Sequence, residues 1–426
     1  MKPGSLEKSV LRRVKPTKRE QKRLSEATNM MKDRFKGLNA RVAPQGSFAK
    51  GTYLKGSSDV DLFFVYPKSI GKERLGKQFF SDTLDKIKGL NYEMAYAEHP
   101  YIKVKTDEGV DMDLVPALEM KFGEKPITAT DRTPLHTDFV NSHLDNKGKD
   151  DVRLLKRFMK GTGVYGAEVK VRGFSGYVAE LLTIKHGSFT NVLKNASGWG
   201  TKTNVELVKP EKNFDDPLII PDPVDPARNT ASAVSLKNVA LFSLAARKYL
   251  EKPDIKFFFP PDDESREKKV KGDVLITDLK IQDNVVEDKL WGQVGKSVDK
   301  LKKSLEHAGY GVINVSAFGD NKEVKIVAHL ESASIPKYKK IKGPMFNLAE
   351  AVDKFLEAHK GEEIFVDDDG RLYAVGERKD DITDIVKNSI SITEKYSLQT
   401  EWLHDGEKVS KENLKFIKLE PSWLRE

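Results

Sequence analysis

The chain has 426 residues, a length that exceeds one ordinary hydrophobic core and predicts two to four domains. Hydrophobic residues make up 38% and charged residues 32%, a balance typical of a soluble globular protein. Cysteine is absent, so disulfides, zinc sites built on thiolates and cysteine nucleophiles are excluded.

The net charge of +8 and the isoelectric point near 9.1 favour a polyanionic partner, with nucleic acid as the first candidate. No apolar run approaches the ~18 residues that a membrane span needs. The basic N-terminus also lacks the apolar stretch of a signal peptide. We therefore expect a cytoplasmic protein with no membrane partner.

The first forty residues are predicted to be helical. Thr17 and Glu20 have the spacing of a capping box, which satisfies free N–H groups at the start of a helix. Apolar residues then recur at helical spacing from Leu24 to Phe35.

Two apolar stretches with alternating acids predict strands, Asp59–Tyr66 and Val110–Val115. Mixed strand and helix patterns continue to about residue 148. The N-terminal third is therefore expected to be a compact α/β or α+β domain.

Residues 150–250 have mainly helical periodicity, with one apolar stripe from Val152 to Met159 and a further helix over Ser235–Leu250. The segment Pro217–Pro226 is rich in proline and aspartate. We expect it to be an ordered loop that crosses the surface.

The C-terminal region begins after a second proline- and aspartate-rich boundary at residues 260–263. A strict apolar stripe from Val294 to Leu305 predicts a helix that ends at Gly309. The elements predicted after it are two strands, a helix and a hairpin, at 311–318, 323–330, 346–359 and Asp369-Gly370. This alternation resembles a ferredoxin-like or RNA-recognition-type α+β unit.

A glycine-rich turn, Gly46–Thr52 (GSFAKGT), is a candidate phosphate-binding motif. Glycine lets the backbone approach a phosphate closely, and a helix that begins there would direct free N–H groups at an anion. Ser47 offers a hydroxyl and Lys50 a positive charge to the same ligand. Such short motifs are common, so this one carries little weight alone.

Asp59 and Asp61 add a second, stronger signal. Side chains alternate along a strand, so these two carboxylates project from the same face. The apolar residues that follow them indicate a buried strand. Two like charges held there are unfavourable unless a cation lies between them, and carboxylate oxygens suit Mg²⁺ or Mn²⁺.

Asp111 and Asp113 have the same spacing in the second predicted strand. If that strand lies beside the first, one of them completes a site for two metal ions that activate an attacking hydroxyl and stabilise a leaving oxygen at phosphorus. Both acids point the same way, so geometry does not choose between them.

These features resemble the DNA polymerase β-like nucleotidyltransferases, which have a Gly-Ser, an acid-x-Asp strand and a later strand aspartate. More narrowly, several blocks resemble the class I, archaeal-type CCA-adding enzymes, a family of tRNA nucleotidyltransferases. They occur in that family's order: GSFAKGTYLKGSSDVDLF, HPYIKV, VDMDLVP, DRTPLH, RLLKRFMKGTGVYGAEVKVRGFSGYVAELL and DPVDPARN. The resemblance is dense to about residue 240 and sparse beyond it.

The resemblance implies an α+β multidomain protein. Residues 1–148 would form a polymerase β-like nucleotidyltransferase domain and 149–252 a mainly helical domain that selects the nucleotide. Residues 253–426 would form a C-terminal α+β body and tail that bind tRNA, with the ferredoxin- or RNA-recognition-like unit inside it.

The resemblance also assigns the acids. It implies two Mg²⁺ ions, with Mn²⁺ as an alternative, on Asp59, Asp61 and Asp113, and leaves Asp111 an auxiliary or structural acid. Lys50 stands where arginine is frequent in the family, so a charge is kept but a bidentate contact with phosphate is not.

Eight residues are implied to bind the nucleotide: Gly46, Ser47, Lys50, Thr133, His136, Lys156, Tyr165 and Arg228. Arg228 would help to select the incoming base, because a guanidinium can address the edges of cytosine or adenine. The plainer alternatives are a surface or capping role for His136, an exposed basic helix face for Lys156, and a helix-start salt bridge for Arg228.

The implied activity is the stepwise addition of C, C and A to the 3′ end of tRNA from CTP and ATP, without a nucleic-acid template. The basic runs 300–303 and 337–342 are candidate contacts with the top half of tRNA, and a homodimer is allowed. A poly(A)-type or other terminal RNA nucleotidyltransferase would use the same three acids. A non-catalytic RNA-binding protein on a decayed fold is disfavoured because the acids and the Gly-Ser are present.

Overall fold

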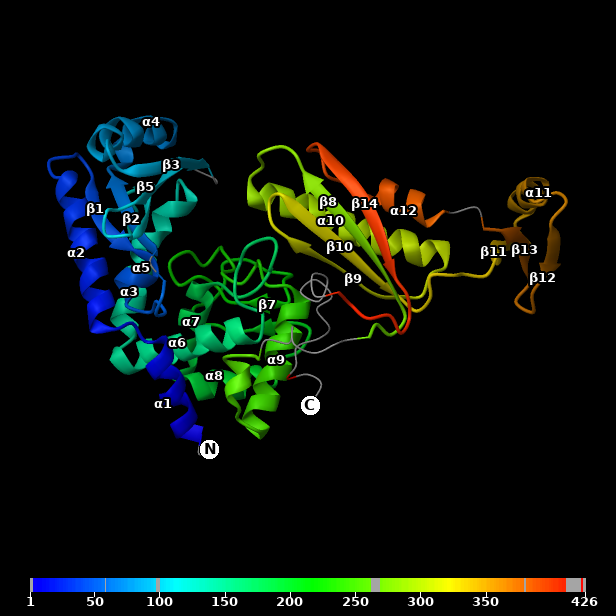
Figure 1. The fold of residues 1–426 in the computed structure, drawn as a ribbon, viewed down its shortest axis with the longest axis horizontal. Coiled ribbons are helices and arrows are strands. Elements are labelled where there is room, and N and C mark those ends of the chain that lie inside the picture. Colours follow the sequence, from blue (N-terminus) through cyan, green and yellow to red (C-terminus); the bar gives the residue numbers. More distant parts are fainter. Residues whose placement is uncertain are drawn as a thin grey trace. The chain divides into compact units, whose positions relative to one another are not determined.

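The computed structural model describes residues 3–57, 59–96, 100–261, 269–378, 381–410 and Trp423. Two compact units make up the chain (Figure 1). The first holds the described residues up to Pro261 together with Trp423, and the second holds those from 269 to 410. The finer division at residues 148 and 252 remains a prediction.

Two helices open the first unit, α1 (Pro3–Val14) and α2 (Lys18–Arg34), as predicted. Thr17 caps α2, because its side chain accepts a hydrogen bond of 3.2 Å from the backbone N–H of Glu20. The Glu20 carboxylate does not turn back to the cap. It accepts a hydrogen bond of 2.7 Å from the backbone N–H of Gly56, so α2 is tied to the loop before the second strand.

A five-stranded sheet in the order β1-β2-β5-β4-β3 forms the centre of the N-terminal region. Its strands are β1 (Arg41–Gln45), β2 (Asp59–Tyr66), β3 (Asn91–Tyr96), β4 (Pro100–Lys105) and β5 (Asp111–Leu118). β2 and β5 are parallel neighbours, and every other pair is antiparallel. Both predicted strands are confirmed, although the second extends to Leu118.

One face of this sheet carries the hydrophobic core. Leu62, Phe64 and Leu114 alternate with the acids and pack under α2 and α4 (Lys72–Thr83). The acids occupy the opposite face, because successive strand side chains point to opposite sides. The short helices of this region are α3 (Gly46–Lys50), η1 (Lys68–Ile70), η2 (Asp85–Ile87) and η3 (Ala129–Arg132), and α5 (Thr133–His143) follows them.

The rest of the first unit is mainly helical, as predicted. Its helices are α6 (Asn146–Gly161), α7 (Gly176–His186), α8 (Phe189–Ala196), α9 (Leu236–Glu251) and η4 (Ile255–Phe257). Phe158 lies at their centre, where its ring contacts five other aromatic rings at centroid distances of 5.5–6.1 Å. Trp423 is 1% exposed and packs on Phe257, so this residue near the C-terminus contributes to the core.

The segment Pro217–Pro226 does not cross the surface, so that prediction was wrong. Leu218 and Ile220 are fully buried in the helical core, and Asp222 is buried as well. Two of its residues form β7 (Leu218–Ile219), which pairs in parallel with β6 (Thr203–Asn204). Burial of the apolar residues between the prolines therefore places the segment in the core. The buried Asp222 then needs hydrogen-bonding partners inside the protein.

The second unit contains a βαββαβ arrangement of ferredoxin-like topology, in the strand order β14-β8-β10-β9. Its elements are β8 (Asp273–Ile281), α10 (Glu287–Ala308), β9 (Val312–Gly319), β10 (Glu323–Leu330), α12 (Ile382–Ser389) and β14 (Tyr396–Leu403). All of its strand pairs are antiparallel. The predicted end of α10 at Gly309 is confirmed by a left-handed φ of 98° there.

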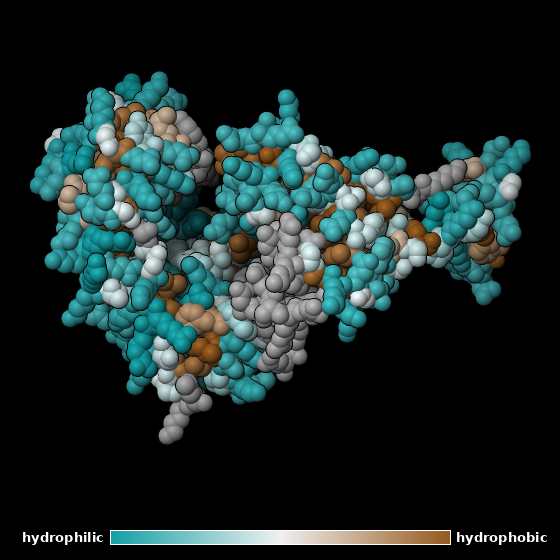
Figure 2. Space-filling model, in the orientation of Figure 1, coloured by the Kyte–Doolittle hydropathy of each residue, from teal (hydrophilic) through white to brown (hydrophobic). Residues whose placement is uncertain are grey.

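A small sheet is inserted between β10 and α12. Its strands are β11 (Tyr338–Met345), β12 (Glu363–Val366) and β13 (Arg371–Glu377), in the order β11-β13-β12. Helix α11 (Ala349–Ala358) lies between β11 and β12 in the chain. The predicted helix and hairpin are present, but they belong to this insertion and not to the ferredoxin-like sheet. Phe346 and Val366 remain 68% and 61% exposed, and apolar residues are visible on the surface of this part (Figure 2).

Among the residues that the structure describes, none of the helices combines the length and the apolar character that a membrane span requires.

Candidate active site

The register of β2 and β5 places four carboxylates side by side. Asp59 pairs with Asp111, and Asp61 pairs with Asp113. Within each strand the two acids are separated by one residue, so all four project from the same face of the sheet.

These carboxylates are not equivalent. Asp59 and Asp111 are exposed, whereas Asp61 and Asp113 are partly buried. Burial, together with the charges of Asp113 and Asp59, raises the pKa of Asp61 to about 6 against the opposing charge of Lys50. Burial also raises the pKa of Asp113, against the opposing charge of Lys103. The inner pair thus lies where negative charge is poorly compensated.

The polar ladder continues onto β4. Lys103 pairs with Asp113 and Lys105 pairs with Asp111 across the antiparallel β4–β5 edge. A surface cavity of about 460 Å³ opens here, lined by Asp59, Asp111, Asp113 and residues of β3 and β4. Three of the four acids therefore line an open space that also presents the side chains of two lysines.

The Gly46-Ser47 turn lies directly against the acids. β1 pairs with β2 so that Gln45 is opposite Asp61, and α3 begins at the next residue. Gly46 has a φ of +64°, and a β-carbon there would overlap the Asp61 carboxylate. Only glycine combines that conformation with so close an approach. The Gly46-Ser47 turn and the carboxylates of β2 and β5 thus form one site.

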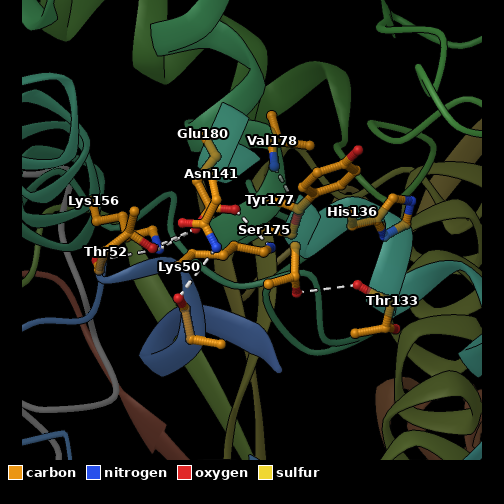
Figure 3. Close-up of polar contacts among 12 residues, drawn as sticks. Lys50, Thr52, Thr133, His136, Asn141, Lys156, Ser175, Tyr177, Val178 and Glu180 are labelled. Atoms are coloured by element: carbon orange, nitrogen blue, oxygen red, sulfur yellow. Dashed lines mark hydrogen bonds and ion pairs between the residues drawn. The ribbon is translucent and has the colours of Figure 1, made fainter. Parts of the chain in front are cut away.

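Lys50, at the end of α3, is buried with a carboxylate that the sequence did not predict. Its Nζ lies 2.8 Å from Oε2 of Glu180, which projects from α7 and is 1% exposed. Lys156 of α6 binds the other oxygen, Oε1, at 3.0 Å. Thr52 donates to the same oxygen at 2.5 Å. Figure 3 shows Glu180 between the two lysines.

Lys156 is 2% exposed, so the alternative of an exposed basic helix face is wrong for it. Tyr165 lies close by, because a β-carbon on Gly176 would meet both the Tyr165 hydroxyl at 3.0 Å and the Lys156 Nζ at 3.3 Å. The structure therefore brings together Lys50, Lys156 and Tyr165 from three separate segments.

A second buried acid, Asp222, contacts two more of the predicted residues, His136 and Arg228. Its carboxylate lies 2.9 Å from Nε2 of His136 and accepts hydrogen bonds from Arg228 Nη1 at 2.9 Å and from the Tyr177 hydroxyl at 3.3 Å. The Asp222 side chain is fully buried, while that of Arg228 is 40% exposed. Arg228 does form a salt bridge, but it lies in a turn and not at the start of a helix.

Tyr177 joins these two groups of residues. Its ring stacks on His136 at a centroid distance of 4.1 Å, and Lys50 Nζ lies 4.9 Å from its centroid (Figure 3). Burial holds the pKa of His136 below its ordinary value, although Asp222 opposes this. The His136 side chain is only 12% exposed and is held by Asp222, so the alternative of a surface histidine is wrong.

Thr133 begins α5, one turn before His136, and its carbonyl accepts a hydrogen bond from Thr137. Three residues of the site were missed from the sequence: Tyr177, Glu180 and Asp222. The signal for Glu180 was a single acid inside the apolar helix YVAELL. Asp222 carried no such signal, because its segment had the composition of a surface loop.

The donor set fits a divalent cation, since partly buried carboxylates of raised pKa stand in register and carboxylate oxygen suits Mg²⁺. Within the described residues, no three acidic or imidazole groups are already gathered tightly enough to hold a metal ion.

Three family models match successive parts of the chain. The nucleotidyltransferase domain matches residues 24–136, the second domain of tRNA nucleotidyltransferase matches 150–259, and the C-terminal domain of CCA-adding enzymes matches 274–402. The strand register of the acids and the first of these matches define the class of protein, a multidomain α+β nucleotidyltransferase.

Full-length relatives narrow this class. The CCA-adding enzyme of Sulfurisphaera tokodaii is 48% identical over 421 residues, which are 99% of this chain and 100% of that protein. The CCA-adding enzyme of Sulfolobus acidocaldarius is 46% identical over 422 residues, with the same coverage. The chain belongs to the family of CCA-adding enzymes. A solved structure of E. coli MS115-1 CdnC with ATP is similar at a TM-score of 0.47 and 19% identity, covering 61% of this chain and 93% of that one.

Proposed function

We propose that the protein adds C, C and A in turn to the 3′ end of tRNA, using CTP and ATP and releasing pyrophosphate, with no nucleic-acid template. The observation that carries this proposal is the register of β2 and β5, which aligns Asp61 with Asp113 beside the Gly46-Ser47 turn. The full-length likeness to CCA-adding enzymes supports the choice of tRNA as acceptor.

Nucleotidyltransferases of this fold generally use divalent metal ions. Here Asp59, Asp61 and Asp113 would hold two Mg²⁺ ions, with Mn²⁺ as an alternative, and Asp111 would be an auxiliary acid. Such ions, when bound, make the 3′-hydroxyl a better nucleophile and neutralise the departing pyrophosphate. Strands β2 and β5 would align the acids. Because Gly46 has no side chain, the α-phosphate could approach them closely.

The triphosphate would be bound from the other side of the turn. Ser47 offers its hydroxyl and backbone N–H, and Lys50 and Lys156 supply charge. Both lysines are buried, which strengthens their attraction for an anion compared with exposed lysines. Thr133 and His136 would contact the sugar or the phosphates from α5.

Base selection would fall to Arg228 and Tyr165. Arg228 keeps one edge on Asp222 and leaves the rest of its guanidinium accessible. A guanidinium fixed in this way offers N–H donors to the acceptor edges of cytosine or adenine. The aromatic ring of Tyr165 offers a stacking surface.

The acceptor RNA is proposed to be bound by the second unit. A-form RNA is recognised through its backbone and shape, which basic side chains contact without reading sequence. The runs 300–303 in α10 and 337–342 around β11 supply such charges. They are our candidates for contact with the top half of tRNA, and a homodimer stays a prediction.

The test is Asp61→Ala, assayed with a tRNA that lacks its CCA end. We expect incorporation of CMP and AMP to fall below detection while affinity for tRNA stays within about twofold, because the acids act on the reacting phosphate and not on RNA binding. Asp107→Ala, an exposed acid in the turn before β5, is the matched control. Substantial turnover by Asp61→Ala would refute the assignment of the acids.

A further inference from the structure

Glu180 is a fully buried acid whose carboxylate is shared by two lysines from distant parts of the chain. Oε2 binds Lys50 Nζ at 2.8 Å, and Oε1 binds Lys156 Nζ at 3.0 Å. Thr52 completes the group, since its hydroxyl donates to Oε1 at 2.5 Å and accepts from Lys156 at 3.0 Å. Both oxygens of Glu180 are therefore engaged.

The charges in this group do not cancel. Two ammonium groups share one carboxylate, so one positive charge is left in excess in a place where both lysines are less than 7% exposed. A buried excess charge is unfavourable unless an ion of opposite sign joins it. Burial by itself raises the pKa of Glu180, but Lys156 and Lys50 outweigh it and lower the pKa to about 2. The carboxylate is thus ionised at all physiological pH values.

Lys50 is the point where this group meets the active site. It ends the five-residue helix α3 that begins at Gly46-Ser47. Its charge acts on Asp61, whose pKa it lowers, and on His136. Glu180 and the ring of Tyr177 hold the ammonium in place from the side of α7.

We propose that Glu180 is the positioning residue of the triphosphate site: it touches no substrate, but it fixes Lys50 and Lys156 as one rigid pair of cations. The proposal rests on the proposed function in that it takes the ligand to be a nucleoside triphosphate. The excess charge of the pair is then matched by the phosphates that CTP and ATP have in common. Glu180 therefore sets affinity for both nucleotides equally and plays no part in choosing the base.

A stabilising role alone explains the arrangement poorly. Replacement of a buried ion pair by apolar residues of similar size is often neutral or stabilising. The residues that follow Glu180 on α7, Leu181 and Leu182, are apolar and fully buried, so the charged group lies in a part of the chain that is otherwise apolar. A charged group here is better explained by what it holds.

The test compares Glu180→Gln with Glu7→Gln by equilibrium binding of CTP, ATP and inorganic tripolyphosphate in the presence of Mg²⁺. Glu7 is a partly buried acid of the same unit that accepts a hydrogen bond from the Tyr249 hydroxyl at 3.2 Å, far from the lysine pair in sequence. Glu180→Gln should weaken all three probes by about ten- to a hundredfold, the scale of a lost charge-assisted hydrogen bond. Tripolyphosphate isolates the phosphate contacts, because it has no base or sugar.

Kinetics separate positioning from a general loss of structure. In Glu180→Gln the KM for CTP and for ATP should rise by the same factor, and Glu180→Asp, which keeps the charge, should recover part of the affinity. In a background that carries both Lys50→Met and Lys156→Met, Glu180→Gln should have little further effect on CTP binding. Unchanged affinity for CTP and tripolyphosphate in a folded Glu180→Gln protein would overturn the proposal, as would a different factor for CTP and ATP.

If Glu180→Gln does not fold, Thr52→Val decides the matter by the same measurements. It removes the hydroxyl that joins Glu180 to Lys156 without changing charge, and a smaller loss of affinity in the same direction is expected. The outcomes remain separable from those of the proposed function. A wild-type protein whose affinity for tripolyphosphate depends on Glu180 but that does not extend tRNA would refute only the function, whereas an unchanged KM for CTP and ATP in a Glu180→Gln protein that adds CCA would refute only the inference.

Discussion

Gly46 and Asp61 are packed so closely that a β-carbon on Gly46 would overlap Oδ2 of the Asp61 carboxylate. The glycine also has a φ of +64°, which other residues rarely adopt. The Gly46-Ser47 turn and strand β2 are thus joined by direct contact.

The first prediction is that Gly46→Ala lowers nucleotide addition by about a hundredfold or more, because it displaces Asp61 and small misplacements at a reacting centre are costly. Gly37→Ala is the control. Gly37 has a similar φ of +86° but no atom within 4 Å of an added β-carbon, so it shares the backbone strain without the overlap. Steady-state CMP addition measures both, and equal rates would contradict the predicted contact.

The second prediction concerns stability without metal. The pKa of Asp61 rises from 3.8 to about 6 on folding, so its contribution to the free energy of unfolding is fully present below pH 3.8 and is lost as the pH rises through 6. In EDTA at pH 7.5, Asp61→Asn should therefore be more stable than the wild type by roughly 2–3 kcal/mol. Near pH 4 this advantage should be almost gone.

Thermal unfolding at the two pH values measures this difference, with Asp107→Asn as the control for removal of an exposed acid. If Asp61→Asn were less stable than the wild type at pH 7.5, the prediction would be contradicted. The negative charge of Asp61 would then be stabilised by neighbouring groups in the folded protein.

The third prediction separates the acids of β5. Asp113 is partly buried opposite Asp61, whereas Asp111 is exposed opposite Asp59. Asp113→Asn should reduce single-turnover CMP addition by about a thousandfold, the scale expected for a group that acts mainly in the transition state. Asp111→Asn should stay within about tenfold of the wild type. The reverse order would exchange their roles.

The fourth prediction concerns Asp222, which holds Arg228 and His136 in place. In Asp222→Asn the guanidinium loses its fixed edge, so the preference for CTP over UTP should fall by about tenfold or more, as expected for the loss of a charge-assisted hydrogen bond. Asp225→Asn, which breaks the 2.7 Å pair with Arg132 instead, is the control. Unchanged selectivity in Asp222→Asn would mean that Arg228 is positioned by other contacts.

Much of the fold follows from local pattern. The strand Asp59–Tyr66 was predicted with its full length, because alternating acids and an apolar run have few other structural solutions. The same holds for the stripe that ends at Gly309. The insertion of β11–β13 into the ferredoxin-like unit was not predicted, since periodicity gives the elements but not which sheet each strand joins.

The site, like the fold, could be predicted from the sequence only in part. The acids were predicted from spacing within each strand, but only the register shows that Asp113 lies opposite Asp61. Lys50 and Lys156 were found as separate charges, and their shared partner Glu180 lies 130 residues beyond Lys50. Asp222 was hidden because proline and aspartate indicate a surface loop, whereas neighbouring Leu218 and Ile220 bury the segment.

The most direct test of the central claim is stepwise extension of a tRNA that ends at its discriminator base, with labelled CTP and ATP supplied singly and together. We predict that CTP alone adds two residues, that ATP alone adds none, and that the two together add C, C and A and then stop. Continued growth with ATP alone would contradict the account and would indicate a poly(A)-type transferase built on the same acids.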